Sequence, residues 1–182
     1  PNSTTKAGTG TMELAANNTY SSSTNINAGI LQYGLSNAIA NGNITLNGGT
    51  LDIKSFSDIV GNVTLTNGTI TGTTGVLNGL LFNVASGTIS AIISGTGDLT
   101  KTTAGTVTLS AANTYSGATF INAGTLSINS MANFGTASSL GTGSVTPTIS
   151  MGATAILLYT GSGHSSSRSI NVTANGATIN AS

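Results

Sequence analysis

Short alternations of apolar and polar residues recur along the chain, each opened by a glycine that is usually followed by threonine. The pattern Gly-Thr-apolar-x-apolar begins at Gly10, Gly29, Gly49, Gly68, Gly87, Gly105 and Gly124. Alternation with a period of two predicts β-strands with one buried face. Successive copies are about 19 residues apart, and a fixed short period of this kind is typical of a solenoid, in which each repeat is one structural unit.

The unit is simplest in the middle of the chain, where residues 44–53, 63–72 and 81–92 each read as strand, turn and strand. Asn-Gly and Gly-Gly pairs supply residues that tolerate a positive φ at the corner. Asn-Gly between apolar runs is also typical of antiparallel hairpins, which are the alternative architecture. The constant phase of the pattern favours a parallel β-helix, in which like residues stack on like. Residues 34–40 are too few for a stable helix, and we expect a loop there.

No single coil can bury its own apolar row, so the stability of such an array must come from stacking. The alternation predicts a core made of Leu51, Ile53, Val63, Leu65, Ile70, Ile89, Val107, Leu109, Ile121, Leu126 and Ile128.

A longer repeat, five coils in length, is superimposed on the short one. Sixteen residues of the first copy are identical to those 95 positions later, namely Thr5, Lys6, Gly10, Thr11, Leu14, Ala16, Asn18, Thr19, Tyr20, Ser21, Thr24, Ile26, Asn27, Ala28, Gly29 and Leu31. The second copy, residues 95–129, resembles the strand-associated repeat of autotransporter passenger domains. Residues 140–145 and 169–182 resemble it more loosely. The resemblance implies a right-handed parallel β-helix exported to the surface of a Gram-negative cell, without implying a particular activity.

We therefore predict an all-β protein, a right-handed parallel β-helix of nine to ten coils with about 19 residues each. Residues 1–182 form one array. Residues 1–130 are regular coils that contain both copies of the repeat, and residues 131–182 are looser coils with longer loops. After Gly124 the pattern is expected to continue once, at Gly143.

Composition narrows the possible functions. Only 4% of the residues are charged and the formal net charge is zero, which excludes nucleic-acid binding driven by phosphate neutralisation. A surface without charge repulsion also favours self-association. The sequence contains no cysteine and no apolar run long enough to span a membrane, and no signal-peptide pattern opens at Pro1, so a secreted protein is expected to be represented here by its mature or a cut form.

Candidate catalytic groups are few. His164 lies in a serine-rich loop without an acid nearby, and a Ser–His pair needs an orienting carboxylate. Glu13 and Asp52 occupy the same position two coils apart, with Gln32 between them, at about 10 Å, which is near the upper limit for an inverting glycosidase pair. Solvated charges are the favoured interpretation, with Lys54 expected to pair with Asp52. No catalytic residue is assigned.

Metal and cofactor sites are not expected either. Residues 95–98 (GTGD) resemble a fragment of a calcium-binding repeat, but the acid does not recur. The glycine pairs in residues 141–143 and 161–163 lack the lysine or third glycine of a phosphate loop, so we interpret them as turns.

Two surface features allow more than one interpretation. Tyr20 and Tyr115, equivalent in the two copies, suit either carbohydrate stacking or, as we favour, packing over a corner of the coil. Outward columns resemble the flat threonine faces of ice-binding solenoids, although threonine suits exposed β positions without any ligand. They consist of Thr11/Glu13, Thr50/Asp52, Thr69/Thr71, Thr88/Ser90, Thr106/Thr108, Thr125/Ser127 and Ser144/Thr146, and they are interrupted by Ile30/Gln32, Glu13 and Asp52.

Neither end of the sequence shows the charged cap that solenoids need for solubility. Taken as a complete chain, it is expected to stack head to tail into an extracellular fibre, with the last strands of one copy beneath the first of the next. The interface would contain Asn2, Thr5, Met12, Leu14, Ile170, Val172 and Ile179. The alternative is a piece of a longer passenger, with the rest of that protein as its partner.

The sequence thus predicts a non-enzymatic extracellular scaffold at the cell surface, for display or adhesion. Its partners would be itself or the remainder of a surface protein, together with a host or cell-surface ligand. A glycan-cleaving β-helix and an ice-binding solenoid are the alternatives.

Overall fold

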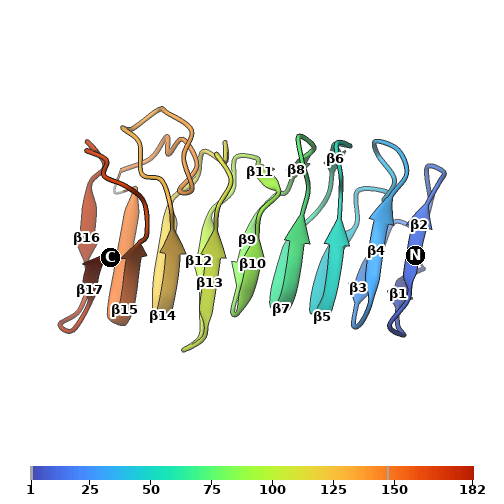
Figure 1. Ribbon diagram of the computed structural model, residues 1–182, viewed down its shortest axis with the longest axis horizontal. Coiled ribbons are helices and arrows are strands. Elements are labelled where there is room, and N and C mark those ends of the chain that lie inside the picture. The colour runs from blue at the N-terminus through green and yellow to red at the C-terminus, as the bar shows by residue number, and fades with distance from the viewer. Residues whose placement is uncertain (1, 147) are drawn as a thin grey trace.

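The computed structural model describes residues 2–146 and 148–182, and within these residues all regular structure is β-strand. Figure 1 shows the strands side by side in chain order along one axis, from the N-terminal to the C-terminal end. Every pairing between named strands is parallel, and among the described residues the one antiparallel contact is an isolated bridge between Asn113 and Ser138. The predicted parallel β-solenoid is therefore confirmed, with about nine coils, and the antiparallel hairpin alternative is wrong.

Each coil contributes strands to two long faces, and three coils add a strand to a short third face. The first face contains β1 (Thr4–Lys6), β3 (Ser23–Ile26), β5 (Asn43–Asp52), β7 (Val63–Thr71), β9 (Phe82–Val84), β12 (Leu99–Lys101), β14 (Thr119–Ile128), β15 (Ile149–Tyr159) and β16 (Ile170–Val172). The second face contains β2 (Thr11–Leu14), β4 (Ile30–Tyr33), β10 (Gly87–Ile89), β13 (Thr106–Leu109), β17 (Thr178–Ala181) and the second halves of the four longest strands. The third face contains β6 (Asp58–Ile59), β8 (Val76–Asn78) and β11 (Ile92–Ser94).

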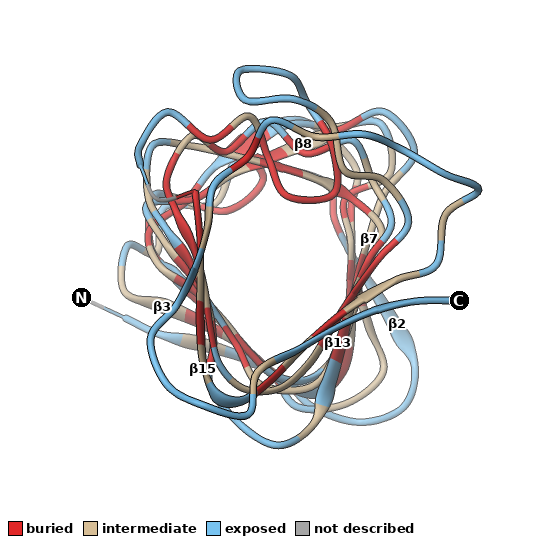
Figure 2. Cartoon of the chain, turned by 90° about the vertical axis from the view of Figure 1, so that its left-hand side faces the viewer, coloured by how far each residue is buried: buried red, intermediate tan, exposed pale blue. Residues whose placement is uncertain are grey.

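Figure 2, which looks down the stack, shows buried residues recurring in the walls of the superposed coils, whereas the last strand, β17, is exposed at every residue. All eleven predicted core residues have 0% of their surface exposed. Each buried aliphatic side chain contributes about 1.5–3 kcal/mol. Residues 34–40 form the expected loop.

The repeat does not stay in phase throughout the stack. Thr88 pairs with Thr108 instead of with Thr106. The cause is the length of the corner between the two long faces. In the fifth coil, which contains β9 and β10, this corner consists of residues 85–86, whereas in the sixth coil, which contains β12 and β13, it consists of residues 102–105. The extra residues are accommodated at the corner, so the threonine columns step by two positions at this coil.

The prediction that the pattern continues at Gly143 is wrong. Gly124 pairs with Ala155 on β15, and Gly143 lies in the connection between β14 and β15. Ser144 and Thr146 lie in the same connection, so they are not members of the threonine columns. No helix in the described part of the chain is long and apolar enough to cross a membrane.

Candidate functional site

The two carboxylates singled out from the sequence lie on one outward column of the second face. Register places Glu13 beside Gln32, and Gln32 beside Asp52. Lys54 Nζ donates to Glu13 Oε2 at 3.1 Å, while Asp52 accepts from Gln32 Nε2 at 3.0 Å and from the Lys54 backbone N at 2.9 Å. The expected ion pair of Lys54 with Asp52 is therefore wrong, because the long lysine side chain reaches across to Glu13 instead.

This arrangement is that of a solvated polar ladder. A glycosidase pair needs one carboxyl group free to protonate the leaving group and another free to act on water or sugar. Here each carboxylate already accepts hydrogen bonds from the chain itself. Such exposed ion pairs contribute little to stability, about 0–1 kcal/mol.

His164 is exposed in the connection after β15. Its Nδ1 lies 2.5 Å from the hydroxyl oxygen of Tyr159, and the two rings meet edge to face. The partner that orients the imidazole is a phenol instead of the carboxylate that a Ser–His nucleophile requires. Within residues 2–146 and 148–182, no three His, Asp or Glu side chains gather in a way that could hold a metal ion.

The equivalent tyrosines have different surroundings. Tyr115 is fully buried, its hydroxyl lies 2.8 Å from Thr119 Oγ1, and its ring packs against Phe82 at 6.4 Å between centroids. Packing, the favoured interpretation, is therefore what the structure shows for Tyr115. Tyr20 is only half-buried.

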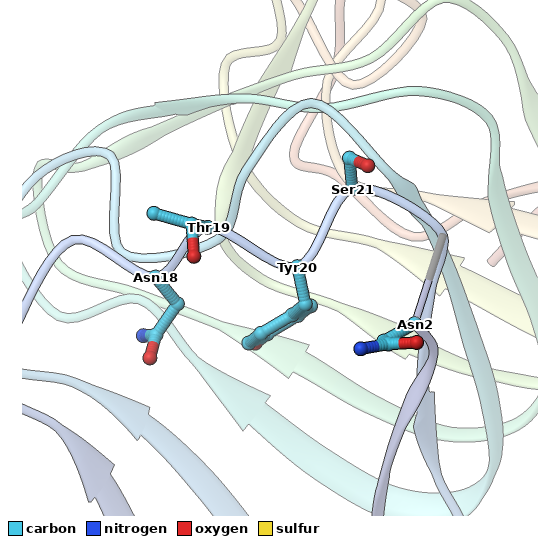
Figure 3. A pocket seen from close by; sticks show the side chains of 5 residues that line it. All are labelled: Asn2, Asn18, Thr19, Tyr20 and Ser21. Carbon is cyan, nitrogen blue, oxygen red and sulfur yellow. The ribbon is translucent and has the colours of Figure 1, made fainter.

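Tyr20 borders two hollows at the N-terminal end. One, of about 390 Å³, is lined by Asn2, Asn18, Thr19, Tyr20 and Ser21, and in Figure 3 Asn2, Asn18 and Tyr20 point toward it. The other, of about 240 Å³, is lined by Thr4, Thr5, Lys6, Met12, Leu14, Asn18, Tyr20 and Leu31, so it opens onto the end of the core.

The residues proposed for an end-to-end interface lie on the first and last coils. At the N-terminal end Met12 is 53% exposed, whereas Leu14 is already buried within the chain. At the C-terminal end Val172 is 53% and Ile179 is 58% exposed. Asn2 and Thr5 are exposed polar residues, and Ile170 is partly buried.

Sequence reasoning missed that three of the four cationic side chains are buried. Lys6 Nζ donates to the carbonyls of Ala7, Gly8 and Ala28, and Lys101 Nζ donates to those of Thr103 and Ala123. Each lysine ends the first-face strand just before a long corner, and burial lowers the pKa of Lys101. Their identity across the longer repeat was a signal that could have revealed this role.

Arg168 is the third buried cation. It lies in the connection between β15 and β16 and contacts the connection between β14 and β15. Its guanidinium nitrogens donate to the carbonyls of Ala132, Thr136, Leu140 and Gly141 and to the hydroxyl of Ser138. Burying an ion is costly unless hydrogen bonds compensate it. Here backbone carbonyls provide those bonds, so Arg168 fixes the course of residues 132–141.

Asp58 is a buried acid on β6, where its Oδ2 accepts a hydrogen bond from the Ile39 backbone N at 2.9 Å. Burial raises the pKa of its carboxyl above 3.8, and the hydrogen bond from Ile39 opposes that shift in part. The folded protein therefore binds this proton more tightly than the unfolded chain does. Stabilisation by protonation is fully present below the unfolded pKa and is lost as the pH rises through the folded pKa.

We expect Asp58→Asn to remove this pH dependence, because the amide keeps an acceptor for Ile39 but does not ionise. Urea unfolding of both proteins between about pH 4 and pH 7 measures it. As the pH rises, the free energy of unfolding of the unsubstituted protein should fall relative to that of Asp58→Asn. A constant difference across this range would contradict the expectation.

Comparison with known proteins agrees with this architecture. Residues 5–32 and 99–128 match the family model described as passenger-associated-transport-repeat, which confirms the resemblance of the two copies. The chain is 35% identical over 185 residues to the protein named adhesin BmaC autotransporter of Brucella suis biovar 1 (strain 1330). That alignment covers 94% of this chain and 5% of the relative, so the chain spans a small part of that protein's length. No solved structure matches the chain.

Proposed function

This chain is a repeat domain of the autotransporter-passenger type, and on that premise we propose that it is a non-enzymatic rod segment of a surface-displayed adhesin. Its relative is named an adhesin, and the solenoid has the low charge and repetitive core of a scaffold. Display outside the cell follows from the same premise.

Uncovered core columns at both ends are the observation that carries this proposal. On the first face, a column of inward-facing side chains runs from coil to coil, and its last two members at the C-terminal end are the neighbours Met151 and Val172. On the second face Leu157 is followed by Ile179. Met151 and Leu157 are buried by the next coil, whereas Val172 and Ile179, in the last coil that the structure describes, are exposed. Each end is therefore suited to receive a further coil of the same kind.

A second copy of the chain is one source of that coil, which makes a head-to-tail fibre the second candidate. The exposed Met12 at one end and Val172 and Ile179 at the other favour it. An interface of this heterologous kind does not close on itself and generates filaments.

We expect the purified chain to form larger species as its concentration rises, because association covers these three side chains. The double variant Val172→Asp, Ile179→Asp should stay monomeric, since carboxylates would have to be buried at the joint. Ile59→Asp on the third face is the matched control and should associate normally. Sedimentation velocity measures the sizes, and electron microscopy shows whether the products are filaments.

A chain that stays monomeric at all concentrations would contradict the fibre proposal and would leave the proposal of a rod segment in place.

The proposal that the chain is not an enzyme has a separate test. Release of reducing sugar from a polysaccharide by the purified chain, lost in Glu13→Gln or Asp52→Asn, would establish the glycan-cleaving alternative instead.

A further inference from the structure

The seventh coil contains the longest connection in the stack. On the first face, Thr119 of β14 pairs with Ile149 of β15 in the next coil. More residues separate these two partners along the chain than separate Phe82 from Leu99, or Ile149 from Ile170, which are the corresponding partners in other pairs of neighbouring coils. The extra residues lie between β14 and β15 and form the orange segment that projects beyond those strands in Figure 1. Stacking of the coils does not require them. Insertions in a repeat array form loops, often on its binding face.

A second loop, from the eighth coil, fastens this insertion. Ser166 Oγ donates to the Ala132 carbonyl at 2.9 Å, the Ser167 backbone N donates to Asn133 Oδ1 at 3.0 Å, and the Phe134 backbone N donates to Ser167 Oγ at 3.2 Å. We call residues 131–142 and 163–168 together the double loop.

Arg168 sits beneath this pair of loops and makes it rigid. Arg168 has only 7% of its surface exposed, and its guanidinium donates only to uncharged acceptors of the first loop. The loops are therefore held by the folded chain before any ligand arrives. A preorganised surface avoids the entropic cost of ordering on binding.

Phe134 is the apolar group that this rigid support displays. Its side chain is 46% exposed at the tip of the turn that the Thr136 N to Asn133 O hydrogen bond closes. Its neighbours Asn133, Gly135 and Thr136 are exposed as well. An aromatic ring held on a rigid turn, with amide and hydroxyl groups beside it, forms a contact surface of the anchoring type.

Charge decides which class of partner fits. From residue 102 to residue 182 the only Lys, Arg, Asp or Glu is Arg168, whose donors are engaged within the chain. Anionic polymers are bound through lysine and arginine, and partner proteins commonly use complementary charge. Neutral sugar rings offer C–H faces to an aromatic ring and hydroxyl groups to amides and other hydroxyls.

We propose that the double loop binds an uncharged polysaccharide, with Phe134 stacking on a sugar ring. This function adds a ligand to the scaffold proposed above and does not depend on the coils stacking end to end.

Biolayer interferometry with immobilised mannan, dextran and β-1,3-glucan tests the proposal. We expect the chain to bind at least one of these polysaccharides. The affinity of Phe134→Ala for that polysaccharide should be lower by about tenfold or more, whereas Phe134→Tyr should retain binding. Leu80→Ala, which truncates a side chain that is 65% exposed elsewhere on the stack, is the matched control and should bind normally. Circular dichroism confirms that each variant is folded.

Three results would overturn the proposal. One is the absence of binding to all three neutral polysaccharides, and another is equal binding by Phe134→Ala. The third is binding restricted to immobilised heparin or gelatin, which would identify an anionic polymer or a protein as the partner. None of these results bears on the sedimentation test of the ends, so the two proposals fail separately.

Discussion

Replacing Lys101 with methionine should lower the free energy of unfolding by about 2–4 kcal/mol. The lysine side chain is 0% exposed, and its ammonium is the donor for the carbonyls of Thr103 and Ala123. Methionine fills a similar volume but donates no hydrogen bond, so those carbonyls lose their partner at the corner between two stacked coils. Urea denaturation followed by circular dichroism measures the change.

Two other lysines provide the comparison. Lys54→Met removes an exposed ion pair with Glu13 and should change stability by less than about 1 kcal/mol. Lys6→Met removes the equivalent corner lysine of the first repeat copy, whose ammonium donates to three carbonyls, so we expect a loss comparable to that at Lys101. Equal, small effects at all three positions would show that the buried ammonium is not what holds the corner.

Gly124→Ala should be about as damaging, at about 2–5 kcal/mol when the backbone and packing costs are combined. Gly124 has a φ of +69°, which costs other residues about 1–2 kcal/mol. An added Cβ would lie 2.3 Å from the Thr103 carbonyl oxygen and 2.5 Å from that of Gly105. Both are backbone atoms of the coil beneath, so relief requires the coils to move apart, and such overpacking adds about 1–3 kcal/mol. Urea unfolding measures the loss.

Two glycines separate these contributions. Gly135 has a φ of +84° and open space around its Cβ position, so Gly135→Ala reports the backbone conformation alone. Gly10 has neither a positive φ nor a neighbour within 4 Å, so Gly10→Ala should be nearly neutral. If Gly124→Ala is no worse than Gly135→Ala, the close approach of the coils does not limit this position.

The candidate sites were less predictable than the scaffold. The column that contains Glu13, Gln32 and Asp52 followed from the period, because parallel strands in register bring equivalent positions together. The partner of Lys54 did not, because a flexible side chain can reach either of two carboxylates. Arg168 gave no signal in the sequence, since its acceptors are backbone carbonyls that lie far from it along the chain and carry no residue identity.

The sequence by itself determined that the chain is a parallel β-solenoid, which strand positions face the core and where the two repeat copies lie. These features depend on period and alternation, which are local and repeat in every coil. Only the tertiary structure decided how successive coils align where the corner lengthens, and where the chain resumes its stack after Gly124. The reason is that stacking is set by contacts between coils: extra residues at a corner or in a connection move the register without changing the alternation within any strand.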